Sequence, residues 1–149
     1  MSDQEVQDFL EANLKVQIAT LDRDGAPHLT TLFYVVQDGK VAFWTYGSSQ
    51  KVKNLERDPR ISALVETGTD YAELAGVSIQ GKAELVRDPD GIRRIGSAVV
   101  TAMAGGADLG ELGEQIVEKQ VAKRVGIVIT PTTVASWDHS KMNALPGMG

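Results

Sequence analysis

The stretch from Gly47 to Arg60 contains the residue types that could bind a phosphate. Small and hydroxyl-bearing residues, Gly47-Ser48-Ser49, stand directly before an expected helix over residues 50–57. Free backbone amides, hydroxyls and the positive end of a helix dipole together suit a phosphate group. Four of the fourteen residues are basic, in a chain whose net charge is −5 at pH 7. The alternative is an ordinary capped surface helix with solvated cations. Ser48 and Ser49 would supply the hydroxyls, and Lys51 stands near this end of the helix as a point charge. Lys53 and Arg57 are four residues apart and share one face of the helix.

A second candidate is the segment His28-Leu29-Thr30-Thr31, which falls in an expected strand over residues 27–36. Side chains two residues apart on a strand lie on the same face. The polar side chains of this segment could therefore face a planar ligand and donate hydrogen bonds to its ring oxygens. The alternative is a strand with one solvated face.

Tyr71, Trp137 and Lys141 are the candidates for a substrate pocket. The two aromatic side chains would border it, and the lysine would reach an anionic group of the substrate. Asp138 and His139 are adjacent, so on a strand they point to opposite faces and do not form an acid–base pair. The sequence identifies no catalytic side chain.

The composition excludes several kinds of site. With no cysteine and only two histidines among 149 residues, thiol chemistry, thiolate metal sites and a multi-histidine metal site are excluded. The negative net charge argues against nucleic-acid binding, whose affinity rests on neutralising phosphates. An acidic N-terminus and short apolar runs predict a cytoplasmic protein with neither an export signal nor a membrane span. With so few nucleophiles and bases, an enzyme of this composition is expected to depend on a bound cofactor.

Hydrophobic patterning predicts a single domain over residues 1–149. Asp38-Gly39 predicts a tight hairpin turn, and Gly76 and Gly81 inside a strand predict bulges or bends. Six strands in hairpin order indicate an antiparallel β-barrel in the α+β class, covered by helices or by a partner subunit. The expected strands cover residues 15–21, 27–36, 41–46, 61–65, 74–86 and 125–137, and the expected helices residues 3–13, 50–57, 88–104 and 111–123.

Taken in order, these segments resemble the flavin/deazaflavin oxidoreductase superfamily, the split β-barrel proteins related to pyridoxamine 5′-phosphate oxidase. The matching pieces run from about residue 14 to 87, and the block from Lys51 to Arg60 is the most specific. The resemblance implies a mainly β split barrel and a homodimer with two cofactor sites at the subunit interface.

By position, the resemblance implies cofactor contacts from three segments. The first segment contacts the phosphate through Ser48, Ser49, Gln50 and Lys51, and the same block contains Lys53, Asn54 and Arg57. The second places Trp44 and Thr45 beside the ring system. The third is the strand that lines the ring, with His28, Thr30 and Thr31. The oxidase itself has one arginine near the position of His28 or Leu29 and another at that of Gln50, and this sequence has neither.

The Lys51–Arg60 block and the ending Leu145-Pro146-Gly147-Met148 are more similar to the actinobacterial branch that uses the deazaflavin coenzyme F420. That cofactor carries a phosphodiester and an anionic polyglutamate tail, which a local run of cations suits. The expected activity is transfer of a hydride from reduced F420 to an enone, lactone, quinone or tetrapyrrole. The alternatives are an FMN-binding oxidoreductase of the same fold and a non-catalytic F420-binding carrier.

Overall fold

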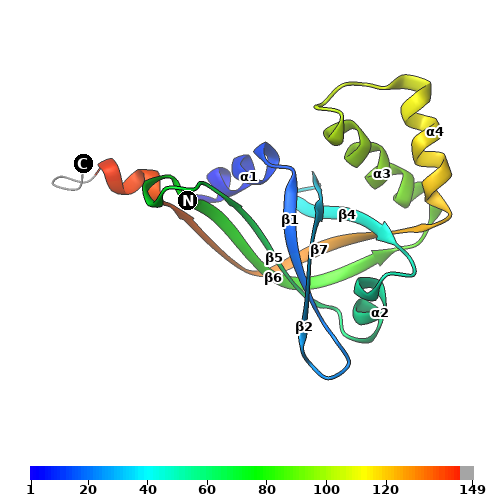
Figure 1. The fold of residues 1–149 in the computed structure, drawn as a ribbon, viewed down its shortest axis with the longest axis horizontal. Helices are drawn as coiled ribbons and strands as arrows, with labels where there is room; N and C mark the ends of the chain where they lie inside the picture. Colours follow the sequence, from blue (N-terminus) through cyan, green and yellow to red (C-terminus); the bar gives the residue numbers. More distant parts are fainter. Residues whose placement is uncertain (145–149) are drawn as a thin grey trace.

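The computed structural model describes residues 1–144, which form one curled β-sheet with helices at its margins (Figure 1). The helices are α1 (Asp3–Ala12), α2 (Gln50–Arg57), α3 (Pro89–Met103) and α4 (Gly110–Val121), with 3-10 turns η1 (Tyr71–Glu73) and η2 (His139–Ala144). The strands are β1 (Lys15–Leu21), β2 (Pro27–Phe33), β3 (Val35–Gln37), β4 (Lys40–Tyr46), β5 (Arg60–Thr67), β6 (Ala75–Val86) and β7 (Arg124–Asp138). All four predicted helices are confirmed, and none of the described helices is long and apolar enough to cross a membrane. The C-terminal segment Leu145–Met148, which carries part of the resemblance to the F420-using branch, lies outside the described residues.

The strands pair antiparallel in the order β2-β1-β5-β6-β7-β4-β3. β2 and β3 are therefore opposite edges of the sheet, yet only Tyr34 separates them in the chain. Two residue steps span at most about 7 Å, so the sheet curls until its edges meet at this point. The hairpin of β1 and β2 extends away from the rest of the sheet (Figure 1). The result is a mainly β half-barrel of the predicted α+β class.

The predicted single strand over residues 27–36 is wrong, and the described sheet has seven strands rather than six. Tyr34 causes the break, because its hydrogen bonds go outside the sheet. Its amide donates to the carbonyl of Leu14 at 3.0 Å, and its buried hydroxyl donates to the carbonyl of Leu10. Both partners lie at or just after the end of α1. The chain is therefore held at the point where it crosses from the β1 edge to the β4 edge.

Two apolar clusters hold the helices on the sheet. The larger fills the inner face of the half-barrel, where Ile18 and Phe43 contact Leu10 and its neighbours from α1. The second lies between the outer face of β4 and helices α3 and α4, and includes Trp44 and Val117. Successive side chains of β4 thus enter different clusters, as the alternation of a strand requires.

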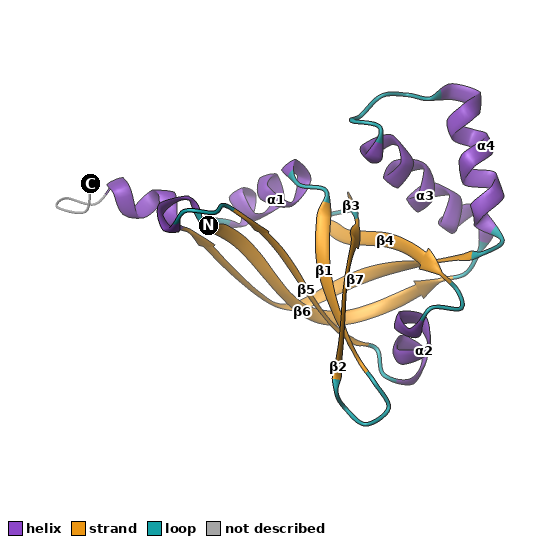
Figure 2. Cartoon of the chain, viewed as in Figure 1, coloured by secondary structure: helices purple, strands orange, loops and turns teal. Residues whose placement is uncertain are grey.

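The outer face of β2, β1 and β5 has no covering helix among the described residues (Figure 2). Leu29 and Phe33 of β2 are 69% and 38% exposed on this face. Leu29 lies opposite Ala19, and Leu64 of β5 lies opposite Gln17 of β1. The face therefore presents apolar side chains that a single chain leaves in contact with water.

The bulge next to Gly81 lies on the neighbouring strand rather than in β6, because Thr132 of β7 is the residue left without a pairing partner, and Gly76 pairs in register with Trp137. The pairing of β6 with β7 changes between Gln80 and Gly81. A Cβ atom at Gly81 would overlap the carbonyl oxygen of Thr130, so the close approach of the two backbones requires glycine.

Candidate cofactor site

The N-terminus of α2 lies after a short turn that follows β4. The amide of Ser49 donates to the carbonyl of Tyr46 at 3.0 Å. The hydroxyl of Ser49 caps the helix by accepting from the amide of Val52 at 3.4 Å. Val52 is fully buried, whereas Ser48 and Gln50 are exposed. Because the first amides of a helix have no intrahelical partner, this end is able to receive an anion.

Asn54 and Arg57 join α2 to the end of β1. The fully buried Asn54 donates to the hydroxyl of Thr20 and to the carboxylate of Asp22, both at 3.1 Å. Its Oδ1 accepts from Gln50 at 2.9 Å and from Arg57 at 3.2 Å. Arg57 also donates to the last carbonyl of β1 at 2.6 Å. These two predicted cofactor residues make their hydrogen bonds within the fold and hold the helix in place.

Lys51 and Lys53 differ in their surroundings. Lys51 is half-buried, and burial lowers the pKa of its ammonium group. Lys53 is exposed. Arg60 is bound to the carboxylate of Asp58 at 2.7 Å. Neither lysine has a carboxylate partner among the described residues. Lys51 is nearer to the start of α2, so it is the cation of this block best placed to bind a phosphate there.

His28 and Thr30 lie on the same face of β2, the face directed toward the inside of the half-barrel. The Nδ1 atom of His28 and the Oγ1 atom of Thr30 are buried without a hydrogen-bond partner in the described part of the chain. An unsatisfied buried polar group costs about 1–3 kcal/mol, so such atoms commonly serve a ligand or an ordered water. Thr31 faces the other way and donates to the carbonyl of Val16 at 3.3 Å.

An open depression connects the two segments. His28 of β2 and Gln50 of α2 line it together with Asp22, Arg23 and Asp24 from the β1–β2 turn. The structure therefore brings together the two stretches of sequence that were predicted separately.

Trp44 and Thr45 lie on opposite faces of β4. The ring of Trp44 packs against Gly96 of α3, where a Cβ atom would overlap it, so Trp44 belongs to the outer cluster. Thr45 is buried on the same face of β4 as Phe43. Within one chain the sheet separates the Trp44 ring from His28. A place for Trp44 beside a cofactor ring stays a prediction.

Tyr71, Trp137 and Lys141 lie at the end of the molecule opposite to α2 (Figure 1). Trp137 of β7 covers Gly76 of β6, its partner in the sheet. Tyr71 in η1 is exposed, and Lys141 forms an ion pair with Glu5 at 2.8 Å. One chain therefore does not bring this group of residues to the depression beside α2.

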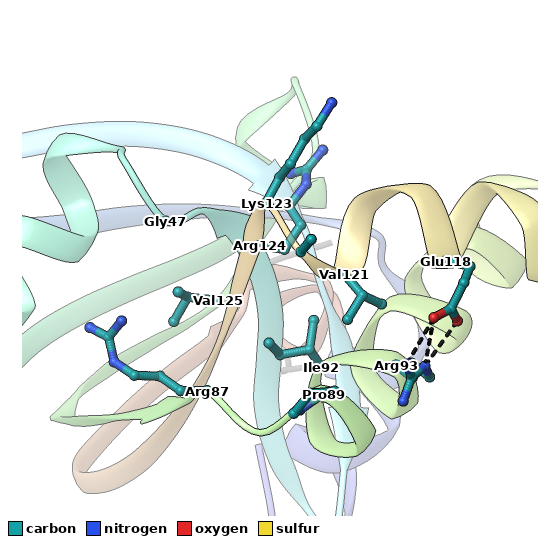
Figure 3. Close-up of a pocket in the computed structure, with 11 residues that line it drawn as sticks. Gly47, Arg87, Pro89, Ile92, Arg93, Glu118, Val121, Lys123, Arg124 and Val125 are labelled. Carbon is teal, nitrogen blue, oxygen red and sulfur yellow. Dashed lines mark hydrogen bonds and ion pairs between the residues drawn. The ribbon is translucent and has the colours of Figure 1, made fainter.

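Two features were not foreseen from the sequence. Thr20 and Asp22 anchor Asn54, and the alternation of Thr20 with the buried Val16 and Ile18 is the signal that could have placed it inside. The second feature is a pocket bounded by α3, α4 and the start of β7 (Figure 3). Its residues come from segments far apart in the chain, so no local pattern indicates it.

The curled antiparallel sheet with helices at its margins is the fold of flavin- and deazaflavin-binding oxidoreductases. The family model described as pyridoxamine 5′-phosphate oxidase matches residues 2–138, and the chain belongs to this family. The resemblance drawn from the sequence is thereby confirmed.

Solved structures support this fold. A conserved hypothetical protein from Mycobacterium tuberculosis is 40% identical, with a TM-score of 0.91, over 100% of this chain and 91% of that one. An FAD-binding protein from Mesorhizobium loti is 20% identical, with a TM-score of 0.63, over 91% of this chain and 92% of that one. An F420 reductase is 20% identical, with a TM-score of 0.60, over 87% of this chain and 94% of that one. No match was found among curated proteins.

Proposed function

We propose that this chain is a reductase that uses coenzyme F420 to reduce an electron-poor small molecule such as an enone, lactone, quinone or tetrapyrrole. The cofactor supplies the hydride, which accounts for an enzyme with few reactive side chains. The observation that carries the proposal is the pair of buried, unpartnered polar atoms on His28 and Thr30. His28 also lines a depression together with Gln50 at the start of α2, where an anion can bind.

Each part of the site has a distinct task. The amides at the start of α2, with Ser48 and Lys51, would hold the phosphodiester. Thr30 would donate its hydroxyl hydrogen to a ring oxygen, and His28 would use Nδ1 as donor or acceptor according to its tautomer. Asn54 acts indirectly, since it fixes α2 relative to β1.

Two features favour F420 over FMN. The chain lacks the arginines that the resemblance associates with the phosphate of FMN, near His28 and at Gln50. Lys51 and Lys53 also remain available for an anionic tail, whereas Arg57 and Arg60 are bound to a β1 carbonyl and to Asp58.

The proposed site is completed by a second copy of the chain. The uncovered apolar face around Leu29 suits a homodimer. The turns η1 and η2 and the end of β7, which carry Tyr71, Trp137 and Lys141, lie at the end of the molecule opposite to α2 (Figure 1). A partner packed on the outer face could supply them as the wall of the acceptor pocket.

Anaerobic titration with F420 and with FMN, followed by fluorescence, tests the cofactor assignment. We expect micromolar binding of F420 and weaker binding of FMN. Lys51→Ala should weaken F420 binding, while the exposed neighbour Lys53→Ala should have a smaller effect. Binding of FMN without binding of F420 would reject the assignment.

A further inference from the structure

The pocket in Figure 3 is a second cavity, separate from the depression beside α2. Its volume is about 560 Å³, which is within the range that holds a small organic molecule. Ile92 and Pro89 of α3, Val121 of α4 and Val125 of β7 form an apolar lining. These side chains give the pocket an apolar surface beside its charged walls, so it suits a molecule that has both an apolar and a charged part.

Two of the basic residues around this pocket are already neutralised. Arg93 is paired with Glu118 and with Asp90, both at 2.8 Å. Arg87 contacts the carboxylate of Glu56 at 3.2 Å. These arginines form the walls of the pocket, and their charges are balanced within the fold.

Lys123 and Arg124 at the rim are different. Neither has a carboxylate partner among residues 1–144. Arg124 is fixed in place: its Nε donates to Gln120 at 3.0 Å, and its guanidinium lies 3.8 Å from the ring centre of Tyr46 and 5.0 Å from that of Trp44. Figure 3 shows both side chains extending in the same direction. Neighbouring like charges repel, and an anion bound between them would remove that repulsion.

We propose that this pocket binds a small organic anion, with its carboxylate or phosphate group between Lys123 and Arg124 and its apolar body on Ile92, Val121 and Val125. The proposal is independent of the cofactor assignment, because none of these residues belongs to the site formed by β2 and α2. A fixed arginine and a flexible lysine suit a planar or tetrahedral anion equally. The two head groups are therefore distinguished by experiment.

Isothermal titration calorimetry with benzoate, phenyl phosphate and inorganic phosphate tests the proposal. We expect saturable binding of at least one aromatic anion with a Kd below about 1 mM, and binding of inorganic phosphate at least about tenfold weaker. The relative affinities of benzoate and phenyl phosphate identify the preferred head group. In a Trp137→Phe background, the same aromatic anion should change the fluorescence of Trp44, because Trp44 lies beneath Arg124.

Matched variants locate the site. Lys123→Ala should weaken binding of the aromatic anion about tenfold, whereas Lys119→Ala, an exposed lysine of α4 outside the pocket, should not change it. Equal effects of the two variants would indicate nonspecific attraction and overturn the proposal. A loss of binding in Lys51→Ala but not in Lys123→Ala would assign the anion to the start of α2 and also overturn it. Absence of saturable binding for both aromatic anions would do the same.

Discussion

Replacement of Thr30 by valine should make the protein more stable and its cofactor binding weaker. Valine has nearly the shape of threonine but lacks the hydroxyl. The Oγ1 atom of Thr30 is buried without a partner in the described part of the chain, so the substitution removes an unsatisfied group and leaves no cavity.

The magnitude follows from the state of this hydroxyl. A buried unsatisfied polar group costs about 1–3 kcal/mol. Because the Thr30 residue as a whole is only half-buried, we expect a gain near the lower limit, about 1 kcal/mol in the free energy of unfolding. Loss of one hydrogen bond to the cofactor should weaken binding by about 0.5–1.5 kcal/mol, or roughly twofold to tenfold in Kd.

Urea unfolding of the unliganded protein and an F420 titration measure the two effects. Thr31→Val is the matched control, because the Thr31 hydroxyl does have a partner, the carbonyl of Val16. Its loss should lower the free energy of unfolding by about 0.5–1 kcal/mol. A decrease in stability for Thr30→Val would show that its hydroxyl is satisfied in the folded protein. Unchanged F420 affinity would show that Thr30 does not contact the cofactor.

Four further perturbations have defined outcomes. Asn54→Ala should lower the free energy of unfolding by about 2–4 kcal/mol in urea, because the buried Thr20 and the half-buried Asp22 lose their hydrogen bonds; a change below about 1 kcal/mol would show that α2 is held by other contacts. Lys51→Ala should weaken F420 binding by about 1–3 kcal/mol. Because burial lowers the pKa of Lys51, its ammonium group loses its charge as the pH rises through that lowered value, and the affinity of the unaltered protein for F420 should fall. Light scattering of the unaltered protein should give a dimer of twice 16.0 kDa, and Leu29→Asp on the exposed face should convert it into monomers. A monomeric unaltered protein would contradict a site at a dimer interface. Hydrogen bonds from Lys141 and from Ser2 lower the pKa of Glu5 to about 2, so they stabilise the fold above the unfolded-state pKa of about 4.3 and lose that effect as the pH falls toward 2. NMR titration of Lys141→Ala should show a Glu5 pKa that is raised but still below its ordinary value, because the Ser2 amide still donates to Glu5.

Local signals were sufficient to predict α2 and its limits. Ser49 is a favoured capping residue, and Asp58-Pro59 ends the helix because the residue before proline avoids the α conformation. Gly81 also marked the irregular pairing of β6 with β7, since a glycine inside a long strand commonly lies where another backbone approaches closely.

The features that could not be predicted from the sequence depend on contacts between residues far apart in the chain. The break at Tyr34 depends on carbonyls at Leu10 and Leu14, which no pattern around Tyr34 indicates. The position of Trp44 depends on Gly96 in α3, whose lack of a side chain makes room for the indole ring. The structural task of Asn54 was likewise hidden, because its partners lie in β1 and in the turn that follows it.

Oxidation of reduced F420 under anaerobic conditions, followed by absorbance in the presence of enones, lactones, quinones and tetrapyrroles, is the most direct measurement of the proposed reaction. F420-dependent reduction predicts oxidation that requires both the protein and one of these acceptors and that slows in Lys51→Ala at subsaturating F420. Saturable F420 binding without oxidation by any acceptor class would contradict the assignment as a reductase and indicate a carrier.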